Sequence, residues 1–248
     1  MADVRARARL RIERSRSGPS VAVDQRDSPP LAFRRCVDGI YYLVATAAGP
    51  LGTDDVAIDI EVGAGAVATV RALGATLAYA SSTARLSLRV LLDEHAILDW
   101  WPGPLIATAR CALAVTTEAE LAATASLRLR EELVLGRHNE RPGRLHHRLS
   151  AQRGRRPLLR HELRIGPDSP GWDGPAVLGP ARALAMALQV DPGRPATSAN
   201  GEGWARLALA AGGELALALG RDLGEARARL DRVAVPADPT ARKRSVIP

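Results

Sequence analysis

Apolar and polar residues alternate with a period of two along much of the first two thirds of the chain. The clearest case is residues 56–62, Val-Ala-Ile-Asp-Ile-Glu-Val, and residues 86–92 repeat the pattern. Successive side chains of a strand point to opposite faces, so the alternation predicts strands with one apolar face. By the same criterion we expect further strands at residues 66–73, 96–101, 105–115, 127–135, 145–151 and 158–165.

The spacing of these segments determines the expected fold class. Turn signals rich in Gly, Pro and Asp separate strands that recur about every 10–15 residues, a pattern typical of all-β proteins. We therefore expect a mainly β, layered and largely antiparallel sheet scaffold, of which a β-helix-like arrangement is one form. No break in composition divides the chain, so residues 1–235 are expected to form a single domain and residues 236–248 a flexible C-terminal tail.

The last third of the chain is more ambiguous than the first two. Residues 180–190 form a short apolar run that fits either a helix or a buried strand. Residues 206–211 and 214–219, joined by two glycines, predict a hairpin. The clearest helix is residues 223–233, because Asp222 and Glu225 have the spacing of a helix N-cap and the apolar residues that follow line one side.

Length and composition exclude several classes of protein. The chain has 248 residues and 46% hydrophobic residues, enough to bury a sizeable core. It contains no apolar run of about 18 residues that would span a membrane, and its Arg-rich start is unlike a secretory signal. Its two cysteines, Cys36 and Cys111, cannot build a disulfide framework, and we expect both to be buried thiols. The sequence therefore predicts a soluble cytoplasmic protein.

Positive charge is concentrated in one stretch of the chain. The formal net charge is +7, and 33 of the 34 basic residues are arginine. Residues 137–164 contain nine arginines against two glutamates, an excess equal to the net charge of the whole chain. An arginine-rich nucleic-acid-binding β module is therefore an alternative function. Base stacking requires exposed aromatic residues, however, and this stretch has none, which favours an acidic protein partner.

Searches for catalytic and ligand-binding motifs find no defined centre. Residues 63–68 match G-x-G-x-x-A, but the β-branched residues that follow predict a turn between strands instead of the helix that a dinucleotide site needs. The adjacent residues His146 and His147 should point to opposite faces of a strand. His138 and His161 are the weak candidates for a transient metal site, and no catalytic residue or tightly bound cofactor is predicted.

A pair of tryptophans is the most distinctive aromatic feature of the chain. Trp100 and Trp101 precede Pro102 at the end of a predicted strand. Alternation places one ring in the core and the other outside, where a tryptophan beside a rigid turn is suited to anchor a partner. Packing beneath a neighbouring loop is the alternative role for the outer ring.

Four segments, taken in order, resemble the UreD (UreH) family of urease accessory proteins. They are the strand at residues 56–62 with its turn, Gly74-Ala75-Thr76 followed by Tyr79 and Ser81, Leu98-Asp99-Trp100-Trp101-Pro102, and Glu132-Leu133-Val134-Leu135-Gly136-Arg137. The likeness extends over about residues 9–233. It implies a β-rich, non-catalytic scaffold that binds a UreF-like accessory protein, a UreG-like GTPase and the urease apoprotein. It also implies nickel in transit to the urease active site, and partner contacts at Trp100, Trp101, Pro102, Gly136 and Arg137.

Overall fold

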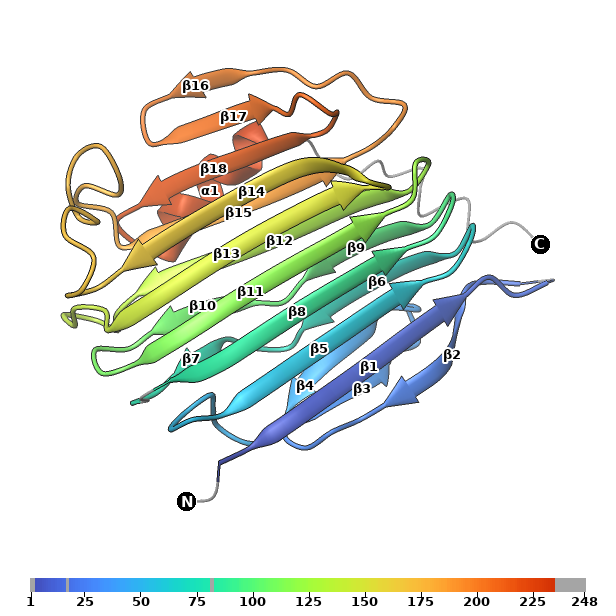
Figure 1. Cartoon of the computed structure of the whole chain (residues 1–248), viewed down its shortest axis with the longest axis horizontal. Helices are drawn as coiled ribbons and strands as arrows, with labels where there is room; N and C mark the ends of the chain where they lie inside the picture. Colours follow the sequence, from blue (N-terminus) through green and yellow to red (C-terminus); the bar gives the residue numbers. More distant parts are fainter. Residues whose placement is uncertain (1–2, 17, 81–82, 235–248) are drawn as a thin grey trace.

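The structure, a computed structural model, describes residues 3–16, 18–80 and 83–234 and is mainly β (Figure 1). In chain order, the strands are β1 (Arg5–Glu13), β2 (Val21–Arg26), β3 (Leu31–Arg35), β4 (Tyr41–Ala45), β5 (Asp55–Val62), β6 (Val67–Ala72), β7 (Thr76–Ala78), β8 (Ala84–Leu92), β9 (Ile97–Trp101), β10 (Pro104–Ala107), β11 (Ala112–Leu121), β12 (Ser126–Leu135), β13 (Arg144–Arg153), β14 (Arg156–Ile165), β15 (Ala183–Val190), β16 (Ala199–Gly201), β17 (Trp204–Ala208) and β18 (Glu214–Gly220). The helix α1 (Leu223–Val233) follows the last strand. The predicted tail, residues 236–248, lies outside the described residues.

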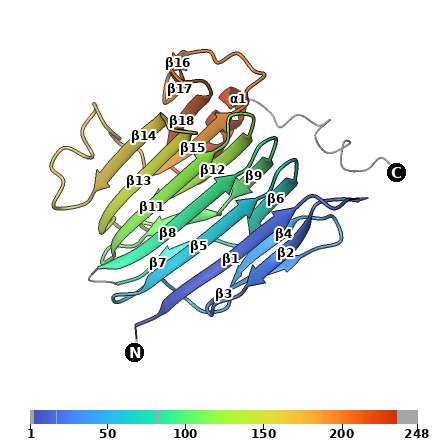
Figure 2. The ribbon, with the colours of Figure 1, turned by 45° about the vertical axis from the view of Figure 1, so that its right-hand side comes forward.

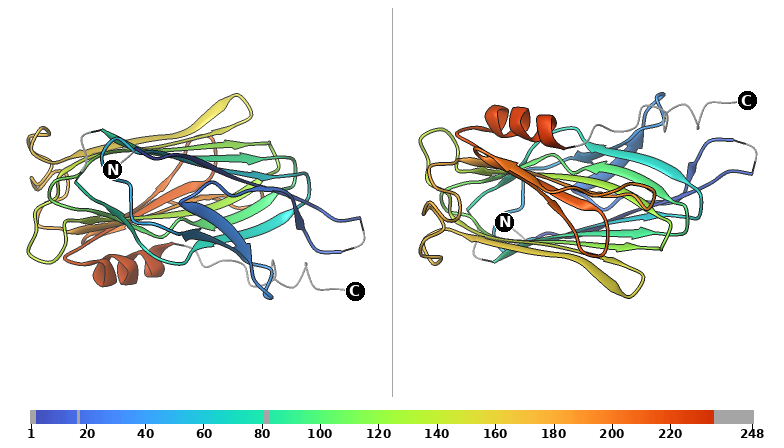
Figure 3. Two further views of the ribbon diagram at one scale, coloured as in Figure 1. Left: turned by 90° about the horizontal axis from the view of Figure 1, so that it is seen from below. Right: turned by 90° about the horizontal axis from the view of Figure 1, so that it is seen from above.

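The strands form two sheets that face each other (Figures 2 and 3). Sheet A has the strand order β14-β13-β11-β8-β5-β1-β2. Sheet B has the order β16-β17-β18-β15-β12-β9-β6-β4-β3, and in addition β10 pairs with β12 and β7 pairs with β10. The helix covers the outer face of sheet B, where it packs on β15, β17 and β18. The core therefore lies between the two sheets, and a second, smaller core lies under the helix.

The central strands stack in parallel, which corrects the expectation of a largely antiparallel scaffold. In sheet A, β1, β5, β8, β11 and β13 pair in parallel, and in sheet B the same holds for β4, β6, β9 and β12. The reason is that the chain crosses to the opposite sheet after β4, β5, β7, β8, β10, β11 and β12. A strand returns to its own sheet only after a full coil, so it runs in the direction of the strand before it. This is the β-helix-like form of the predicted scaffold, with antiparallel strands at its ends.

The turn after β5 illustrates this crossing. Gly65 has φ +65°, a left-handed conformation that glycine adopts without strain, and the backbone N–H of Ala66 donates to the carbonyl of Gly63 at 3.0 Å. The chain then continues as β6 in the opposite sheet. The G-x-G-x-x-A segment is therefore a corner between sheets, as the prediction of a turn required.

The structure resolves two apolar runs that the sequence left misassigned or ambiguous, residues 105–115 and 180–190. The predicted strand at residues 105–115 is two strands, β10 and β11, because a turn closed by Thr108 and Cys111 carries the chain between the sheets. The ambiguous run at residues 180–190 contains strand β15. Its alternate residues face the main core and the core under α1, which accounts for its continuous apolar sequence.

Other differences concern the start of the chain and Cys36. No strand is predicted before residue 56, and the structure adds β1 to β4. In β1 arginine alternates with alanine, whose small side chain gives only a weak apolar signal. The expectation of two buried thiols holds for Cys111 and is wrong for Cys36, which is exposed in the β3–β4 hairpin. None of the described helical residues form a segment long and apolar enough to cross a membrane.

The cap of helix α1 gives the first testable prediction. Asp222 accepts a hydrogen bond from the backbone N–H of Glu225 at 2.8 Å, and the Glu225 carboxylate accepts one from the N–H of Arg221 at 2.7 Å. Replacing Asp222 by alanine leaves a helix donor without its acceptor and should lower the free energy of unfolding by about 1 kcal/mol. Urea unfolding measures this loss. Asp173→Ala, which removes an exposed loop carboxylate, is the control, and equal effects would contradict the capping role.

Candidate functional site

A cluster of polar side chains lies in the interior between the two sheets. Thr117 of β11, Glu131 of β12, His147 of β13 and His161 of β14 all occupy inward-facing positions of their strands. The Thr117 hydroxyl donates to Glu131 Oε1 at 2.5 Å, and His147 Nε2 lies 3.1 Å from Glu131 Oε2. The rings of His147 and His161 meet edge to face with centroids 6.3 Å apart. Strand stacking thus joins four residues that are far apart in sequence.

The electrostatics of the cluster favour the ionised form of Glu131 and the neutral form of His161. Burial by itself raises the pKa of Glu131, but the nearby His147 and the Thr117 hydroxyl outweigh it, so the pKa lies below its ordinary value. Burial lowers the pKa of His161, and the adjacent His147 lowers it further, so His161 is neutral at pH 7. The Nδ1 atoms of His147 and His161 are buried and have no hydrogen-bond partner among the described residues.

The chemistry available to this cluster is limited. The Thr117 hydroxyl donates to the Glu131 carboxylate, but the side chains of Thr117, Glu131 and His147 are almost completely buried, so this hydroxyl is not presented to a substrate. The described residues contain no group of three His, Cys, Asp or Glu side chains placed to hold a metal ion. What remains is a buried polar network with two imidazole nitrogens available to accept or donate a proton, or to contact a passing cation.

A groove on the outer face of sheet B lies beside helix α1. It has a volume of about 300 Å³ and is lined by Arg71, Asp99, Trp101, Arg128, Arg130, Glu132 and Arg227. The Glu132 side chain is completely buried and accepts hydrogen bonds from Arg227 at 3.0 and 2.7 Å and from Arg130 at 2.8 Å. This ion pair fastens α1 to β12, because a paired buried carboxylate is costly to separate from its partners.

Trp101 forms the apolar part of this groove. The guanidinium of Arg227 lies 5.4 Å from the centre of the Trp101 ring, within the range of a cation–π interaction. The ring is half-buried, and its Nε1 has no partner among the residues that the structure describes. Tryptophan and arginine are the residue types most enriched at the energetic centres of protein interfaces. The groove therefore has the composition of a partner-binding site.

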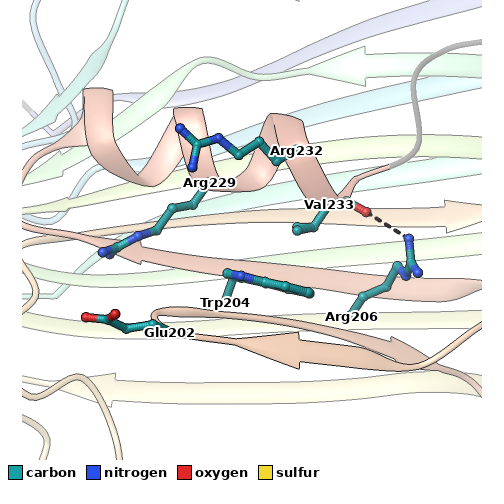
Figure 4. A pocket seen from close by; sticks show the side chains of 6 residues that line it. All are labelled: Glu202, Trp204, Arg206, Arg229, Arg232 and Val233. Carbon is teal, nitrogen blue, oxygen red and sulfur yellow. Dashed lines mark hydrogen bonds between the residues drawn. The ribbon is translucent and has the colours of Figure 1, made fainter.

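A second groove lies on the other flank of α1, between the helix and the β16–β17 hairpin (Figure 4). It has a volume of about 530 Å³ and is lined by Glu202, Trp204, Arg206, Arg229, Arg232 and Val233. Arg206 donates from Nη1 to the carbonyl of Val233 at 3.2 Å, which ties β17 to the end of the helix. The helix thus has a tryptophan and several arginines on each side.

The loop after β12 is held by close backbone contacts. Gly136 has φ +85°, and a Cβ there would lie 2.1 Å from the carbonyl oxygen of Glu140, so only glycine fits. Arg137 donates to both oxygens of the Glu140 carboxylate at 3.0 Å. These hydrogen bonds, with that of the Arg137 backbone N–H, hold the pKa of Glu140 at about 2. Arg137 therefore shapes this loop and is not a free cation.

The structure separates the residues that the sequence predicted as partner contacts. Trp100 is fully buried in the core, whereas Trp101 faces outward, as the alternation predicted for the pair. Pro102 forms the bend between β9 and β10. Gly136 and Arg137 lie at the other end of β10, because the N–H of Gly136 donates to the carbonyl of Ala107. The predicted contact residues therefore lie at two separate positions, one at each end of β10. Their role in binding stays a prediction.

The two predicted metal candidates, His138 and His161, lie in different parts of the structure. His138 is exposed in the loop after β12, whereas His161 belongs to the interior cluster. As expected, His146 and His147 face opposite sides of β13: His146 contacts Glu162 outside at 2.8 Å, and His147 contacts Glu131 inside. Sequence reasoning missed the role of Glu131 with these histidines. The available signal was a polar residue at an inward position of an otherwise apolar alternation.

These features define a β-rich scaffold with two tryptophan–arginine grooves around one helix. The family model for the UreD urease accessory protein matches residues 4–246, and the chain belongs to this family. A role in urease maturation follows from that membership.

Individual relatives show the extent of the similarity. The chain is 37% identical to the urease accessory protein UreD of Parafrankia sp., over 93% of this chain and 88% of that protein. It is 41% identical to the UreD 2 protein of Saccharopolyspora erythraea, over 81% and 76% of the two chains. For UreD of Streptomyces coelicolor the identity is 38%, over 92% and 94%. The resemblance deduced from four short segments is thereby confirmed over nearly the whole chain.

Separate substitutions of the two tryptophans should lower the free energy of unfolding by different amounts. Trp100→Ala removes a fully buried ring from the core and should lower the free energy of unfolding by about 3–5 kcal/mol. Trp101→Ala removes a half-buried ring and its contact with Arg227, and should cost about 1 kcal/mol. Denaturant unfolding measures both values. Losses of similar size would contradict the assignment of one ring to the core and the other to the groove.

The interior cluster predicts how stability depends on pH. His161 has a lowered pKa in the folded protein, so the unfolded chain binds protons more readily as pH falls below about 6.5. The free energy of unfolding should therefore decrease from pH 7 towards pH 5. Glu131, whose pKa is also lowered, adds a further loss only below about pH 4.3, the ordinary value for Glu.

His161→Leu should flatten the decrease between pH 7 and pH 5, because the buried titrating group is gone. His138→Leu, which removes an exposed histidine from the loop after β12, is the control for the loss of one imidazole, and its effect on the slope should be smaller. Urea unfolding at a series of pH values measures both variants. An unaltered slope in His161→Leu would show that this group does not set the pH dependence.

Proposed function

We propose that this protein is a non-catalytic scaffold of urease maturation that binds the urease apoprotein, a UreF-like accessory protein and a UreG-like GTPase. In this role it assists the insertion of nickel into the urease active site, in the cytoplasm. The observation that carries the proposal is the match of residues 4–246 to the UreD urease accessory protein family. The tryptophan–arginine grooves around α1 support it, since a scaffold needs surfaces of this composition.

The Trp101 groove is the part of this scaffold that we expect to anchor a partner. Its ring is presented on a rigid frame, because Pro102 follows directly and the buried Glu132–Arg227 pair fixes the neighbouring helix. A preformed groove loses little side-chain freedom when a partner binds, which favours affinity. The loop at Gly136 and Arg137, at the far end of β10, would then contribute a separate contact.

Nickel enters this proposal as cargo, without a tightly bound cofactor. Imidazole nitrogen is a ligand type that suits nickel. His147 contacts the Glu131 carboxylate through Nε2, and the His161 ring meets the His147 ring, while the Nδ1 atoms of both rings are buried without a partner among the described residues. The negative charge of Glu131 favours a cation in this region. We expect these side chains to be the ones that an ion passing between the sheets would meet. Exposed His138 would contact the ion only outside the interior.

The proposal is tested by reconstituting urease maturation. The urease structural genes and the UreF- and UreG-like genes are co-expressed in nickel-containing medium, with and without this chain, and urease activity and bound nickel are measured. Omission should leave the apoprotein present but inactive. Trp101→Ala should weaken the binding free energy of a partner by about 2 kcal/mol, the size of an interface hot spot, while the chain stays folded. Less of that partner should then co-purify.

The matched control is Ile97→Ala, which truncates an exposed side chain on the same strand and the same face. Its effect on co-purification should be small. Full urease activity without this chain would overturn the proposed function. Wild-type binding by a folded Trp101→Ala variant would instead remove only the anchor role of that residue.

A further inference from the structure

The structure divides the arginine-rich stretch at residues 137–164 into two sets. Five of its nine arginines have carboxylate partners: Arg137 pairs with Glu140, Arg141 with Asp173, Arg144 with Asp168, and Arg148 and Arg164 with Glu162. The remaining four are Arg153, Arg155, Arg156 and Arg160. None of these four has a carboxylate partner among the described residues.

The four unpaired arginines are neighbours in space. They lie at the tip of the β13–β14 hairpin and on the first half of β14, where Arg153 pairs in register with Arg156 and Ser150 with Arg160. We call them the hairpin arginines. Arg155, Arg156 and Arg160 are exposed. Glu118 of β11 is in register with Ser150 of β13, which is in register with Arg160 of β14, so Glu118 and Arg160 are two strands apart. Four arginines are therefore grouped at one end of the hairpin without an ion pair to any described carboxylate.

Arg153 has unmet hydrogen-bonding capacity. Its Nε and Nη2 atoms are buried and have no partner in the part of the chain that the structure describes. Its guanidinium lies beside the turn at Gly212, which joins β17 and β18. A charged donor without an acceptor is costly, and a guanidinium is best satisfied by a carboxylate that accepts two parallel hydrogen bonds. The buried atoms of Arg153 are out of reach of a partner, so an acidic group from outside the chain would be met by the exposed Arg155, Arg156 and Arg160.

We propose that the hairpin arginines form a docking site for an acidic surface of a partner protein. The inference rests on the proposed function, since it identifies one of the surfaces through which the scaffold would meet its partners. The hairpin belongs to sheet A, whereas α1 and its grooves cover sheet B, and the two lie on opposite faces of the molecule (Figure 3). One partner at the hairpin and another at the Trp101 groove can therefore be bound together.

Protein is favoured over nucleic acid because of what surrounds the charge. β13, β14 and their turn contain no Phe, Tyr or Trp. Their aromatic rings are those of His146 and His147 in β13 and of His161, which lies in β14 and faces the interior. Single-stranded nucleic acid is held by stacking on exposed aromatic rings as well as by charge. Pro157 and the exposed arginines also discourage a further strand from pairing with the edge of β14. What the hairpin offers is charge recognition by guanidinium groups.

The test is a triple substitution, Arg155→Glu/Arg156→Glu/Arg160→Glu, which reverses the exposed charges and leaves the half-buried Arg153 in place. The control is Arg14→Glu/Arg16→Glu/Arg194→Glu, an equal change of charge at exposed arginines elsewhere. Binding is measured with a labelled octa-glutamate peptide as the carboxylate probe, and with single-stranded and duplex DNA of about 20 nucleotides as phosphate probes. Both variants are first shown by circular dichroism and thermal unfolding to fold like the wild type.

The peptide should bind the wild-type chain, and its Kd should rise with salt concentration, because the contact is electrostatic. The hairpin variant should lose about tenfold or more in affinity, and the control variant distinctly less. In the reconstituted urease system, the hairpin variant should also lose co-purification of one partner that the control variant retains. Charge-neutral Arg155→Gln/Arg156→Gln/Arg160→Gln should give an intermediate loss.

Two results would overturn the inference. Equal losses in the hairpin and control variants would show that only net charge matters. Tighter binding of DNA than of the peptide, lost in the hairpin variant alone, would identify a nucleic-acid site instead. Either result can occur while the wild-type chain still activates urease, so failure of the docking site is distinct from failure of the proposed function, in which the wild-type chain itself has no effect on activation.

Discussion

The in-register parallel stacking of strands is the constraint on which the rest of this structure depends. Because β1, β5, β8, β11 and β13 align residue against residue, side chains at equivalent positions form continuous columns between the two sheets. One such column contains Leu10, Ile60, Val90, Ala119 and Ala151, all almost completely buried. Any polar residue that enters a column must find its partner inside. Thr117, Glu131 and His147 do so by bonding to one another.

The same register orders the outer face of sheet A. Arginines on β1 and β8 alternate with acidic residues on β5 and β11, so that Arg7 pairs with Asp59, Arg9 with Glu61 and Arg89 with Glu120. Each exposed pair contributes little to stability. Their collective effect is to neutralise a face that would otherwise repel itself. An arginine cluster left outside this scheme, as at the β13–β14 tip, is therefore more informative about partners than the net charge of the chain.

The sequence predicts the strands well and their connections poorly. Alternation is a local property, so the inward and outward faces of residues 56–62 and 86–92, and the opposite orientations of Trp100 and Trp101, follow from the sequence alone. Whether strands pair in parallel depends on where each turn sends the chain, which no local pattern records. For the same reason the meeting of Glu131 with His147 and His161, from three different strands, could not be deduced. The doubly buried β15 was ambiguous because both of its faces are apolar.

Strand β12 links the interior cluster with the outer groove. Glu131 faces inward to Thr117 and His147, and the next residue, Glu132, faces outward to Arg130 and Arg227. Both carboxylates are buried, and each is held by partners on its own side of the sheet. The two carboxylates belong to consecutive residues of one strand, so the polar contacts on the two sides of sheet B meet at a single peptide bond. Alternation along β12 accounts for this arrangement, because it sends neighbouring side chains to opposite faces of the sheet.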